Sequence, residues 1–201
     1  IINMSDYNPD NADNQMVKYL LGDYIEPGIV YDLVRRSAMC MDMRKHGEPL
    51  ICKIINYTPN LAVHGHDATS PTGRLAEIKI ESETESSKFE ANASWGSTID
   101  LPKLQKLKKE DQEIIQAGVD YKGRLVYILR KNINETWIPG KLYERVIAKS
   151  TTPKTTHTQL GDDFEILYLN RDKLEKVKSR NNIVLKFNQK LVDNDPHICV
   201  G

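Results

Sequence analysis

Long apolar runs are missing from this sequence, so neither a membrane-spanning helix nor a secretory leader is expected. Cysteines are few: Cys40, Cys52 and Cys199 cannot all pair, and their spacing fits no metal site, which favours reduced thiols in a cytoplasmic protein. Aromatic residues make up only 7% of the chain, and 28 basic residues balance 28 acidic ones. This balance gives general polyanion binding no support, although a local positive groove can exist in a neutral chain.

Hydrophobic periodicity predicts a mixed α/β fold. The 201 residues fit a single domain, in which residues 1–13 form a polar, loose arm. We expect helices over 14–21, 28–45, 101–117 and 172–180, and strands over 51–58, 61–65, 74–82, 123–130, 164–170 and 182–188. Gly47 and Pro49 are expected to end the second helix, and 149–163 to form a loop. This order predicts a central sheet with helices on both faces and a parallel crossover into 123–130.

A tight turn is predicted at Ser70-Pro71-Thr72-Gly73. Pro71 is preset for the first central position of a type I turn, and Gly73 can adopt the left-handed conformation of a bulge residue. A three-residue loop of this kind places Ser70 opposite Arg74. The turn therefore sets the register of the whole hairpin.

In that register Asp67 lies opposite Glu77. Side chains alternate along a strand, so Lys79 shares the face of Asp67 and Glu77, while Ile78 points to the other face. A two-residue loop would instead place Ala76 opposite Asp67 and split the set across the sheet. The bulged turn thus predicts two carboxylates and one ammonium at a single place.

These groups are the ones that metal-assisted cleavage of a phosphodiester requires. Mg²⁺ prefers oxygen ligands and commonly takes one or two carboxylates, which Asp67 and Glu77 would supply, with the Ile78 carbonyl as a third ligand. Lys79 would orient the attacking water, lower its pKa or stabilise the transition state. The chain has a second Asp/Glu-x-Lys triplet, Asp120-Tyr121-Lys122, but it falls in a predicted turn without a partner acid.

Asp67, followed after nine residues by Glu77-Ile78-Lys79 on a hairpin, resembles the site of the PD-(D/E)XK nuclease superfamily, and within it the type II restriction endonucleases. The resemblance covers residues 15–130 and implies a restriction-endonuclease-like core, with 131–201 supplying C-terminal strands and recognition loops. It implies Asp67, Glu77 and Lys79 as catalytic residues, Mg²⁺ as cofactor, double-stranded DNA as substrate and a homodimer that cuts both strands of a palindromic site. His66 stands where many members have proline.

Two loops are the candidate recognition segments, although each also fits an ordinary connection. Residues 92–98 precede a helix N-terminus, where backbone N–H groups can bind phosphate, and 149–160 offer donors suited to groove edges. The candidate DNA-binding residues are Asn92, Ser94, Trp95, Ser97, Lys154, Thr156, His157 and Gln159.

Several alternatives stay open from the sequence. Glu26 or Asp32 could add an acid to the site, although surface solvation explains both, and the acidic run Glu81–Glu90 is unfavourable beside DNA unless it faces away. A structure-specific nuclease such as a junction resolvase would use the same chemistry. A non-catalytic binding or assembly protein, with Asp67, Glu77 and Lys79 as a surface ion network, is the third hypothesis.

Overall fold

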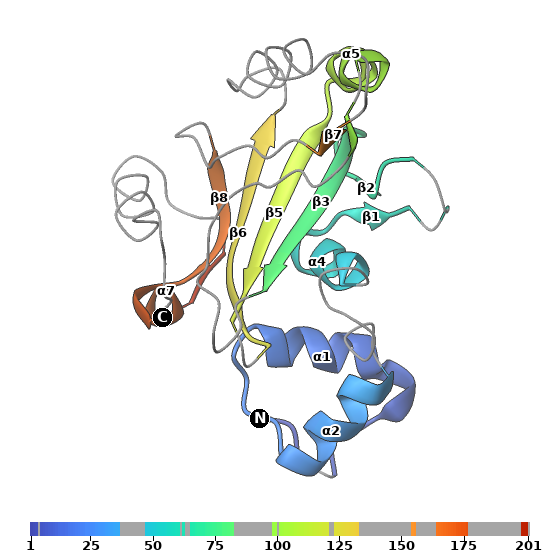
Figure 1. Ribbon diagram of the computed structural model, residues 1–201. Helices are drawn as coiled ribbons and strands as arrows, with labels where there is room; N and C mark the ends of the chain where they lie inside the picture. The colour runs from blue at the N-terminus through green and yellow to red at the C-terminus, as the bar shows by residue number, and fades with distance from the viewer. Residues whose placement is uncertain are drawn as a thin grey trace.

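The computed structural model describes residues 1–3, 5–36, 47–60, 62, 65–82, 98–99, 101–120, 123–132, 154–155, 164–176 and 198–200. They form an α/β fold around a seven-stranded open sheet of order β1-β2-β3-β5-β6-β8-β9 (Figure 1). The helical elements are η1 (Pro9–Asn11), α1 (Ala12–Leu20), α2 (Pro27–Arg36), α4 (Glu48–Ile55), α5 (Leu101–Glu110) and α7 (Arg171–Lys176). The strands are β1 (Thr58–Pro59), β2 (Ala68–Thr69), β3 (Leu75–Ser82), β4 (Thr98–Ile99), β5 (Glu113–Val119), β6 (Leu125–Asn132), β7 (Lys154–Thr155), β8 (Glu165–Asn170) and β9 (Ile198–Val200).

The sheet is mixed. β3 runs parallel to β5 and β8 parallel to β9, whereas the β1–β2, β2–β3, β5–β6 and β6–β8 pairs are antiparallel. The expected parallel crossover therefore exists, but it leads from β3 through α5 into β5, not into β6. The predicted mixed α/β class is confirmed at this level.

The helix predicted over 101–117 is too long, because α5 ends at Glu110 and 113–119 is the strand β5. Asp111 adopts a left-handed conformation with φ of 49°, which stops the helix. All seven residues of β5 are buried. A strand covered on both faces shows no polar alternation, so its sequence is easily mistaken for a buried helix.

The first predicted strand, 51–58, is also wrong, since Glu48–Ile55 form helix α4. Pro49 lies in the first turn of this helix, where its missing N–H is tolerated, and does not mark a helix end. Asn56 closes the helix with a left-handed φ of 61°. Leu50 and Ile51 are fully buried, and α4 packs against β3 and β1.

The predicted turn is confirmed. Gly73 has a φ of 86° and donates its N–H to Ser70 O at 2.9 Å, while Ser70 N–H donates to Arg74 O at 2.8 Å. The β2–β3 register pairs Ala68 with Ala76, as the bulged turn requires. The upstream strand predicted over 61–65 is not found at residues 62 and 65, and 61, 63 and 64 lie outside the described residues.

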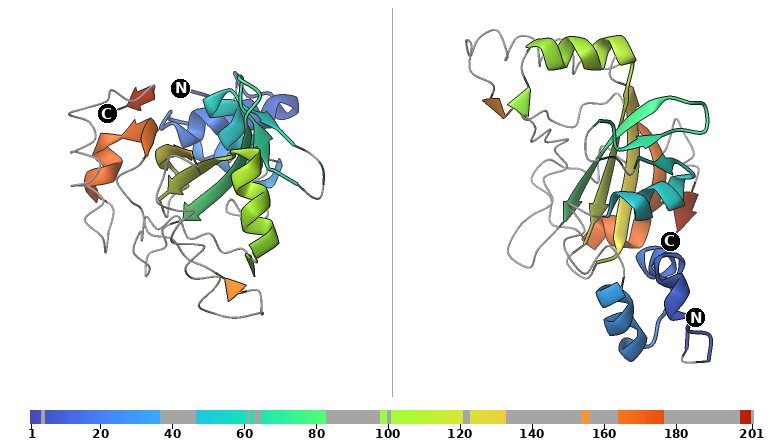
Figure 2. Two further views of the ribbon diagram at one scale, coloured as in Figure 1. Left: turned by 90° about the horizontal axis from the view of Figure 1, so that it is seen from above. Right: turned by 90° about the vertical axis from the view of Figure 1, so that its right-hand side faces the viewer.

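The helices α1 and α2 lie beyond one end of the sheet and α5 beyond the other (Figure 2). In the segment 1–13, expected to form a loose arm, Ile2 is 4% exposed and pairs with the backbone at Ile25. Arg124 joins the β5–β6 turn to α1, because its guanidinium lies 3.7 Å from the centre of the Tyr19 ring.

The predicted strands over 123–130 and 164–170 and the start of the predicted helix over 172–180 are confirmed. β6 and β8 are strands, and α7 begins the predicted helix. In the predicted loop 149–163, residues 154–155 form the short strand β7, which pairs with β4 in a separate sheet. The strand predicted over 182–188 lies outside the described residues, and β9 has no counterpart in the sequence-based prediction. None of the described helices has the length and apolar character needed to cross a bilayer.

Candidate active site

The edge of β3 holds Asp67 in place. β2 is only two residues long, so beyond the Ala68–Ala76 pair the Ile78 N–H on this edge needs another acceptor. Asp67 Oδ2 accepts from it at 2.7 Å. The backbone of Asp67 is held as well, since its N–H donates to Ala76 O at 3.0 Å and its carbonyl accepts from Asn60 N–H at 2.8 Å. The carboxylate is therefore fixed beside the Glu77-Ile78-Lys79 segment.

Glu77 and Lys79 lie on the opposite face of β3 from the core. Both side chains are partly exposed, and Lys79 Nζ lies 4.0 Å from Glu77 Oε2. Ile78 between them is 2% exposed and belongs to the hydrophobic core. The structure thus brings the Asp67 carboxylate to the segment that carries Glu77 and Lys79. The β2–β3 register extends only to the Ala68–Ala76 pair, and the Asp67 N–H donates to Ala76 O, so the pairing of Asp67 with Glu77 and the catalytic roles of the three residues stay predictions.

Glu48 is a further acid at this place that the sequence reading missed. Burial raises the pKa of its carboxyl, the negative charge of Asp67 raises it further, and Lys79 opposes the shift. Glu48 therefore lies within electrostatic reach of both residues. Glu48 is the first residue of α4, whereas the sequence pattern predicts a helix end at Gly47 and Pro49, so no helix start is expected there. An acid beside a proline in a first helical turn is the signal that could have revealed this helix start.

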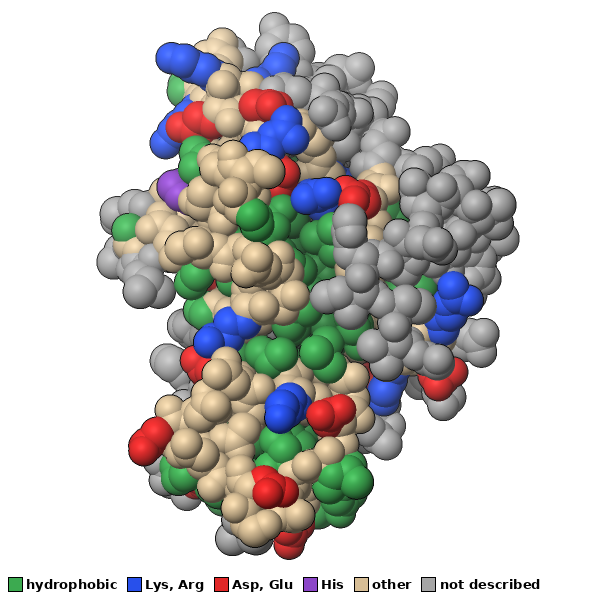
Figure 3. Space-filling view, turned by 180° about the vertical axis from the view of Figure 1, so that it is seen from behind, with side chains coloured by type: hydrophobic (Ala, Val, Ile, Leu, Met, Phe, Trp, Pro, Cys, Tyr) green, Lys and Arg blue, Asp and Glu red, His purple; other side chains and the backbone are tan. Residues whose placement is uncertain are grey.

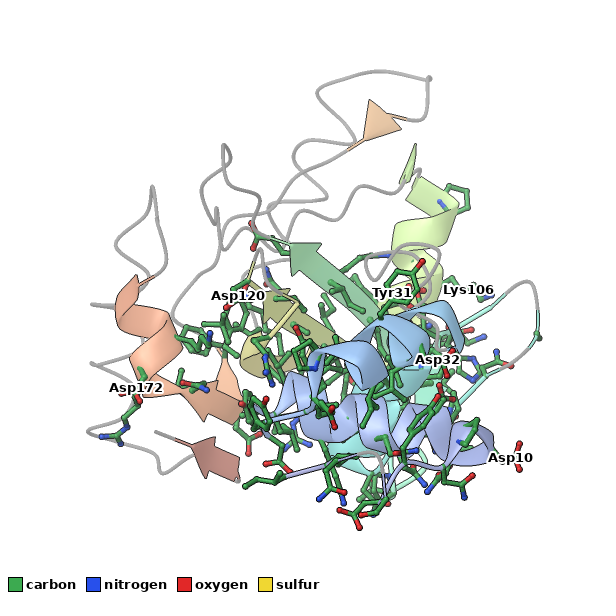
Figure 4. All side chains as sticks on the ribbon, turned by 90° about the horizontal axis from the view of Figure 1, so that it is seen from below. Asp10, Tyr31, Asp32, Lys106, Asp120 and Asp172 are labelled. Atoms are coloured by element: carbon green, nitrogen blue, oxygen red, sulfur yellow. The ribbon has the colours of Figure 1, made fainter. Side chains whose placement is uncertain are left out.

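The two acids considered from the sequence lie elsewhere. Asp32 is on α2 and accepts a hydrogen bond from Tyr7 Oη (Figure 4). Glu26 is exposed just before the same helix, and its N–H donates to Ile2 O at 3.2 Å. Both belong to the α1–α2 end of the molecule.

Cys52 lies under the site on α4 and is fully buried. Burial, with smaller contributions from Glu48 and Asp67, raises the pKa of its thiol to about 12. The thiol is therefore neutral at physiological pH, and a neutral thiol is neither a good nucleophile nor a metal ligand.

Glu81, the first residue of the acidic run after the site, forms a hydrogen bond with a buried tyrosine. Tyr127 Oη donates to Glu81 Oε2 at 3.2 Å, and Gln116, which pairs with Lys79 across β3–β5, donates to Tyr127 Oη at 3.4 Å. Burial, followed by Glu81, raises the Tyr127 pKa well above its ordinary value, so the hydroxyl keeps its proton. Glu81 thus accepts a hydrogen bond from a buried tyrosine and is partly exposed; the rest of the acidic run, 83–90, lies outside the described residues.

An open pocket of about 410 Å³ adjoins Glu77. Its lining comes from the hairpin and from the α5–β5 junction: Gly65, His66, Glu77, Pro102, Lys106, Glu110 and Gln112. Arg74 of the hairpin forms ion pairs with the α5–β5 junction, because its guanidinium lies 2.5 Å from Asp111 Oδ2 and 3.8 Å from Glu113 Oε1. Charged side chains of both signs gather at the end of the molecule that carries α5 (Figure 3).

The donor set suits a hard cation with few protein ligands. Within the described ranges, no group of three or more His, Cys, Asp or Glu side chains is arranged to hold a metal. Asp67 and Glu77 are carboxylates, and the Ile78 carbonyl points to the same edge as its N–H, which Asp67 binds. Two carboxylates and one carbonyl leave room for waters and a phosphate oxygen, as Mg²⁺ requires. His66, just before Asp67, has its Nε2 3.4 Å from Thr69 Oγ1.

The candidate recognition residues cannot be placed. Asn92, Ser94, Trp95, Ser97, Thr156, His157 and Gln159 lie outside the described residues, and Lys154 is described only as part of β7. The second triplet is far from the site, since Asp120 follows the other end of β5 from α5 (Figure 4). Asp120 accepts from Arg124 N–H at 2.8 Å and lies 3.0 Å from Lys173 Nζ, which is a structural role.

No protein-family model matches the sequence, and the comparison with curated proteins gives no match either. The function is therefore inferred from the geometry of the residues around β3.

Proposed function

We propose that the protein is a Mg²⁺-dependent endonuclease that hydrolyses phosphodiester bonds of double-stranded DNA, with a site of the PD-(D/E)XK type. One observation carries the proposal: Asp67 Oδ2 is fixed at 2.7 Å from the Ile78 N–H, on the strand that also presents Glu77 and Lys79. The crossover from β3 through α5 to the buried β5, followed by antiparallel β6, supports a restriction-endonuclease-like core.

In this proposal Asp67, Glu77 and the Ile78 carbonyl hold the metal, which supplies charge neutralisation at the phosphate and a more acidic bound water. Lys79 is close enough to Glu77 to face the same phosphate, at an Nζ–Oε2 distance of 4.0 Å. Its ammonium would orient the attacking water and stabilise the negative charge that develops on the phosphoryl oxygens.

Glu48 takes the place in the proposal that the sequence left to Glu26 or Asp32. Its raised pKa reflects burial and the negative charge of Asp67, which together outweigh the opposing charge of Lys79. A divalent cation on Asp67 would stabilise the ionised carboxylate of Glu48, which could then bind a metal-coordinated water.

The resemblance of the hairpin to the PD-(D/E)XK site also suggests a substrate and an assembly. A sequence-specific type II restriction enzyme would act as a homodimer, with two-fold symmetry matching a palindromic site. Its phosphate contacts would make the affinity for DNA fall steeply with salt.

The direct test incubates the protein with a mixed-sequence plasmid and Mg²⁺, beside Lys79→Ala, an EDTA sample and Lys18→Ala as a matched control. Lys18 is an exposed lysine on α1, at the other end of the molecule. We expect discrete fragments from the wild type and Lys18→Ala, and intact plasmid from Lys79→Ala and in EDTA.

Intact plasmid in every sample, together with no Mn²⁺ binding in a titration that compares wild type with Asp67→Asn, would contradict the nuclease proposal and favour a surface ion network. Cleavage confined to branched or frayed DNA would retain the chemistry and change the substrate.

A further inference from the structure

The helix α5 has an exposed face that carries two cations. Pro102, Gln105, Lys106 and Lys109 are all exposed, and their spacings of three and four residues place them on one side of the helix. The four residues include two lysines, one turn apart, and no acid. A basic helix face of this kind is simply solvated unless its position gives it an anionic partner.

The pocket beside Glu77 shows where this face lies. Pro102 and Lys106 line the pocket together with Glu77, so the basic face of α5 adjoins the proposed metal site. The Lys106 side chain is 67% exposed, and its Nζ lies 3.8 Å from Glu110 Oε1 (Figure 4). An exposed ion pair contributes little, so Lys106 can exchange the Glu110 carboxylate for a phosphate.

A segment that the sequence singles out for DNA recognition lies beside the start of α5. The strand β4 ends at Ile99, two residues before the helix, and Ile99 pairs with Lys154 of β7. Lys154 belongs to the candidate recognition loop 149–160. The pairing therefore brings the backbone of that loop next to the helix with the basic face.

The end of the molecule away from α5 exposes acids. Asp10, Asp23 and Glu26 are exposed around α1 and α2, and acidic side chains gather at that end (Figure 3). The chain as a whole has no net charge, so a polyanion gains only from the place where cations are concentrated. A polyanion is therefore repelled from the α1–α2 end and attracted to α5.

We propose that the exposed face of α5 binds the phosphate backbone of duplex DNA beside the bond that is cut. The inference rests on the proposed function, because the scissile phosphate at Glu77 fixes where the strand passes. Lys106 contacts the phosphate next to the scissile one, and Lys109 contacts the phosphate after it. Three residues of helix rise about 4.5 Å, and a DNA strand has one charge per about 3.4 Å of its axis, so two flexible lysines can reach neighbouring phosphates.

The test measures DNA affinity without cleavage. A fluorescent duplex of mixed sequence is titrated in EDTA at several salt concentrations, with anisotropy as the readout. The double variant Lys106→Gln/Lys109→Gln is compared with the wild type and with Lys18→Gln/Lys53→Gln, which loses the same charge from exposed positions of α1 and α4. Lys53 Nζ donates to Asn14 of α1 at 3.1 Å, so both control positions belong to the α1 end. Glutamine is about as good a helix former as lysine, so the helices are retained.

We expect the plot of log affinity against log salt to be shallower by about two in the α5 variant, one for each lost phosphate contact. Its affinity at low salt should be about tenfold weaker. The loss should be the same for duplexes of different sequence, because phosphate contacts position the strand and do not read its bases. The control variant should keep the slope and the affinity of the wild type.

Failure of the wild type to bind the duplex, an unchanged slope in the α5 variant, or an equal loss in the control would overturn this inference. Binding of the wild type to phosphatidylglycerol vesicles but not to the duplex would also overturn it and assign the face to a membrane surface. Plasmid cleavage in Mg²⁺ by the same preparations separates the two proposals. Cleavage with an unchanged slope removes the α5 surface and leaves the nuclease, whereas a shallower slope without any cleavage supports the surface and contradicts the nuclease.

Discussion

Asp67 has two properties that a single substitution can separate. Its carboxylate carries a negative charge, and its Oδ2 accepts the edge N–H of Ile78. Asn retains an acceptor of the same size but loses the charge. We therefore expect Asp67→Asn to change the free energy of unfolding by less than about 1 kcal/mol and to slow cleavage about 100-fold or more. Thermal unfolding and plasmid cleavage measure the two effects.

Asp67→Ala is the comparison for that pair of measurements. It removes the acceptor as well as the charge, so its unfolding free energy should fall by roughly 1–3 kcal/mol below that of Asp67→Asn. Equal stability of the two variants would mean that the contact with Ile78 contributes nothing. Full cleavage by Asp67→Asn would remove Asp67 from the metal site.

Glu48 should make stability depend on pH. Its folded-state pKa is raised by burial and then by Asp67, so the folded protein binds the proton more tightly than the unfolded chain. The stability contribution of the protonated form is complete below the ordinary carboxyl pKa and is lost as the pH rises through the raised one. We expect Glu48→Gln to unfold at a higher temperature than the wild type at pH 8 in EDTA, and the difference to vanish near pH 4.

Mg²⁺ should act against this difference in unfolding temperature between Glu48→Gln and the wild type. A cation at Asp67 stabilises the ionised Glu48, so adding Mg²⁺ at pH 8 should raise the unfolding temperature of the wild type more than that of Glu48→Gln. Glu26→Gln is the control, since Glu26 is exposed at the other end of the molecule and should behave as the wild type. The same shift in all three proteins would place Glu48 outside the metal site.

At the level of elements, the sequence predicts the hairpin well because its signals are local. Pro71 and Gly73 determine the turn, and the turn determines which residues face one another across β2 and β3. The register, the shared face of Glu77 and Lys79 and the burial of Ile78 all follow from it. An alternation of polar and apolar residues survives in β3 because one of its faces is only partly buried.

The errors occur where burial removes that alternation. In α4 the segment 50–55, which is apolar except for Lys53, is too short for periodicity to separate a helix from a strand, and the sequence pattern predicts a helix end at Pro49 although it lies in the first turn of a helix. In β5 every residue is buried, so the segment could be joined to the preceding helix. Both errors affect the site, since α4 contributes Glu48, and Gln112, the residue just before β5, lines the adjoining pocket. Their positions depend on tertiary packing, which single-sequence patterns do not encode.

Gly73 should prove essential to the turn. Its φ of 86° is a conformation that side chains with a Cβ disfavour, although the Cβ itself would meet nothing within 4 Å. Gly73→Ala should therefore lower the free energy of unfolding by roughly 1–2 kcal/mol. Gly28→Ala is a matched control on α2: it also has open space, its φ is not positive, and we expect a gain of up to about 1 kcal/mol.

Chemical denaturation measures both glycine variants under the same conditions. A Gly73→Ala protein as stable as the wild type would show that the turn can adopt another conformation, and the β2–β3 register that pairs Ala68 with Ala76 would lose its main determinant.

At the scale of the whole molecule, the candidate chemistry is confined to one end of the sheet. The hairpin and the α5–β5 junction line one pocket there, while α1 and α2 lie at the opposite end (Figure 2). The described residues contain one such candidate site per chain, and in the proposed nuclease one site would cut one strand. A double-strand break by this chemistry is therefore most direct with two subunits, each carrying its own Asp67, Glu77 and Lys79.

Mixed subunits test this arrangement. Wild type and Lys79→Ala are combined in equal amounts, allowed to exchange, and added to supercoiled plasmid with Mg²⁺. In a homodimer about half of the assemblies would pair one active with one inactive subunit, so nicked circles should accumulate. Wild type diluted with buffer to the same active concentration should give linear product with few nicks. A protein–DNA complex whose sedimentation mass exceeds that of the DNA by one chain of 23.0 kDa, with linear product from the mixture as from the diluted sample, would instead describe a monomer that cuts the two strands in turn.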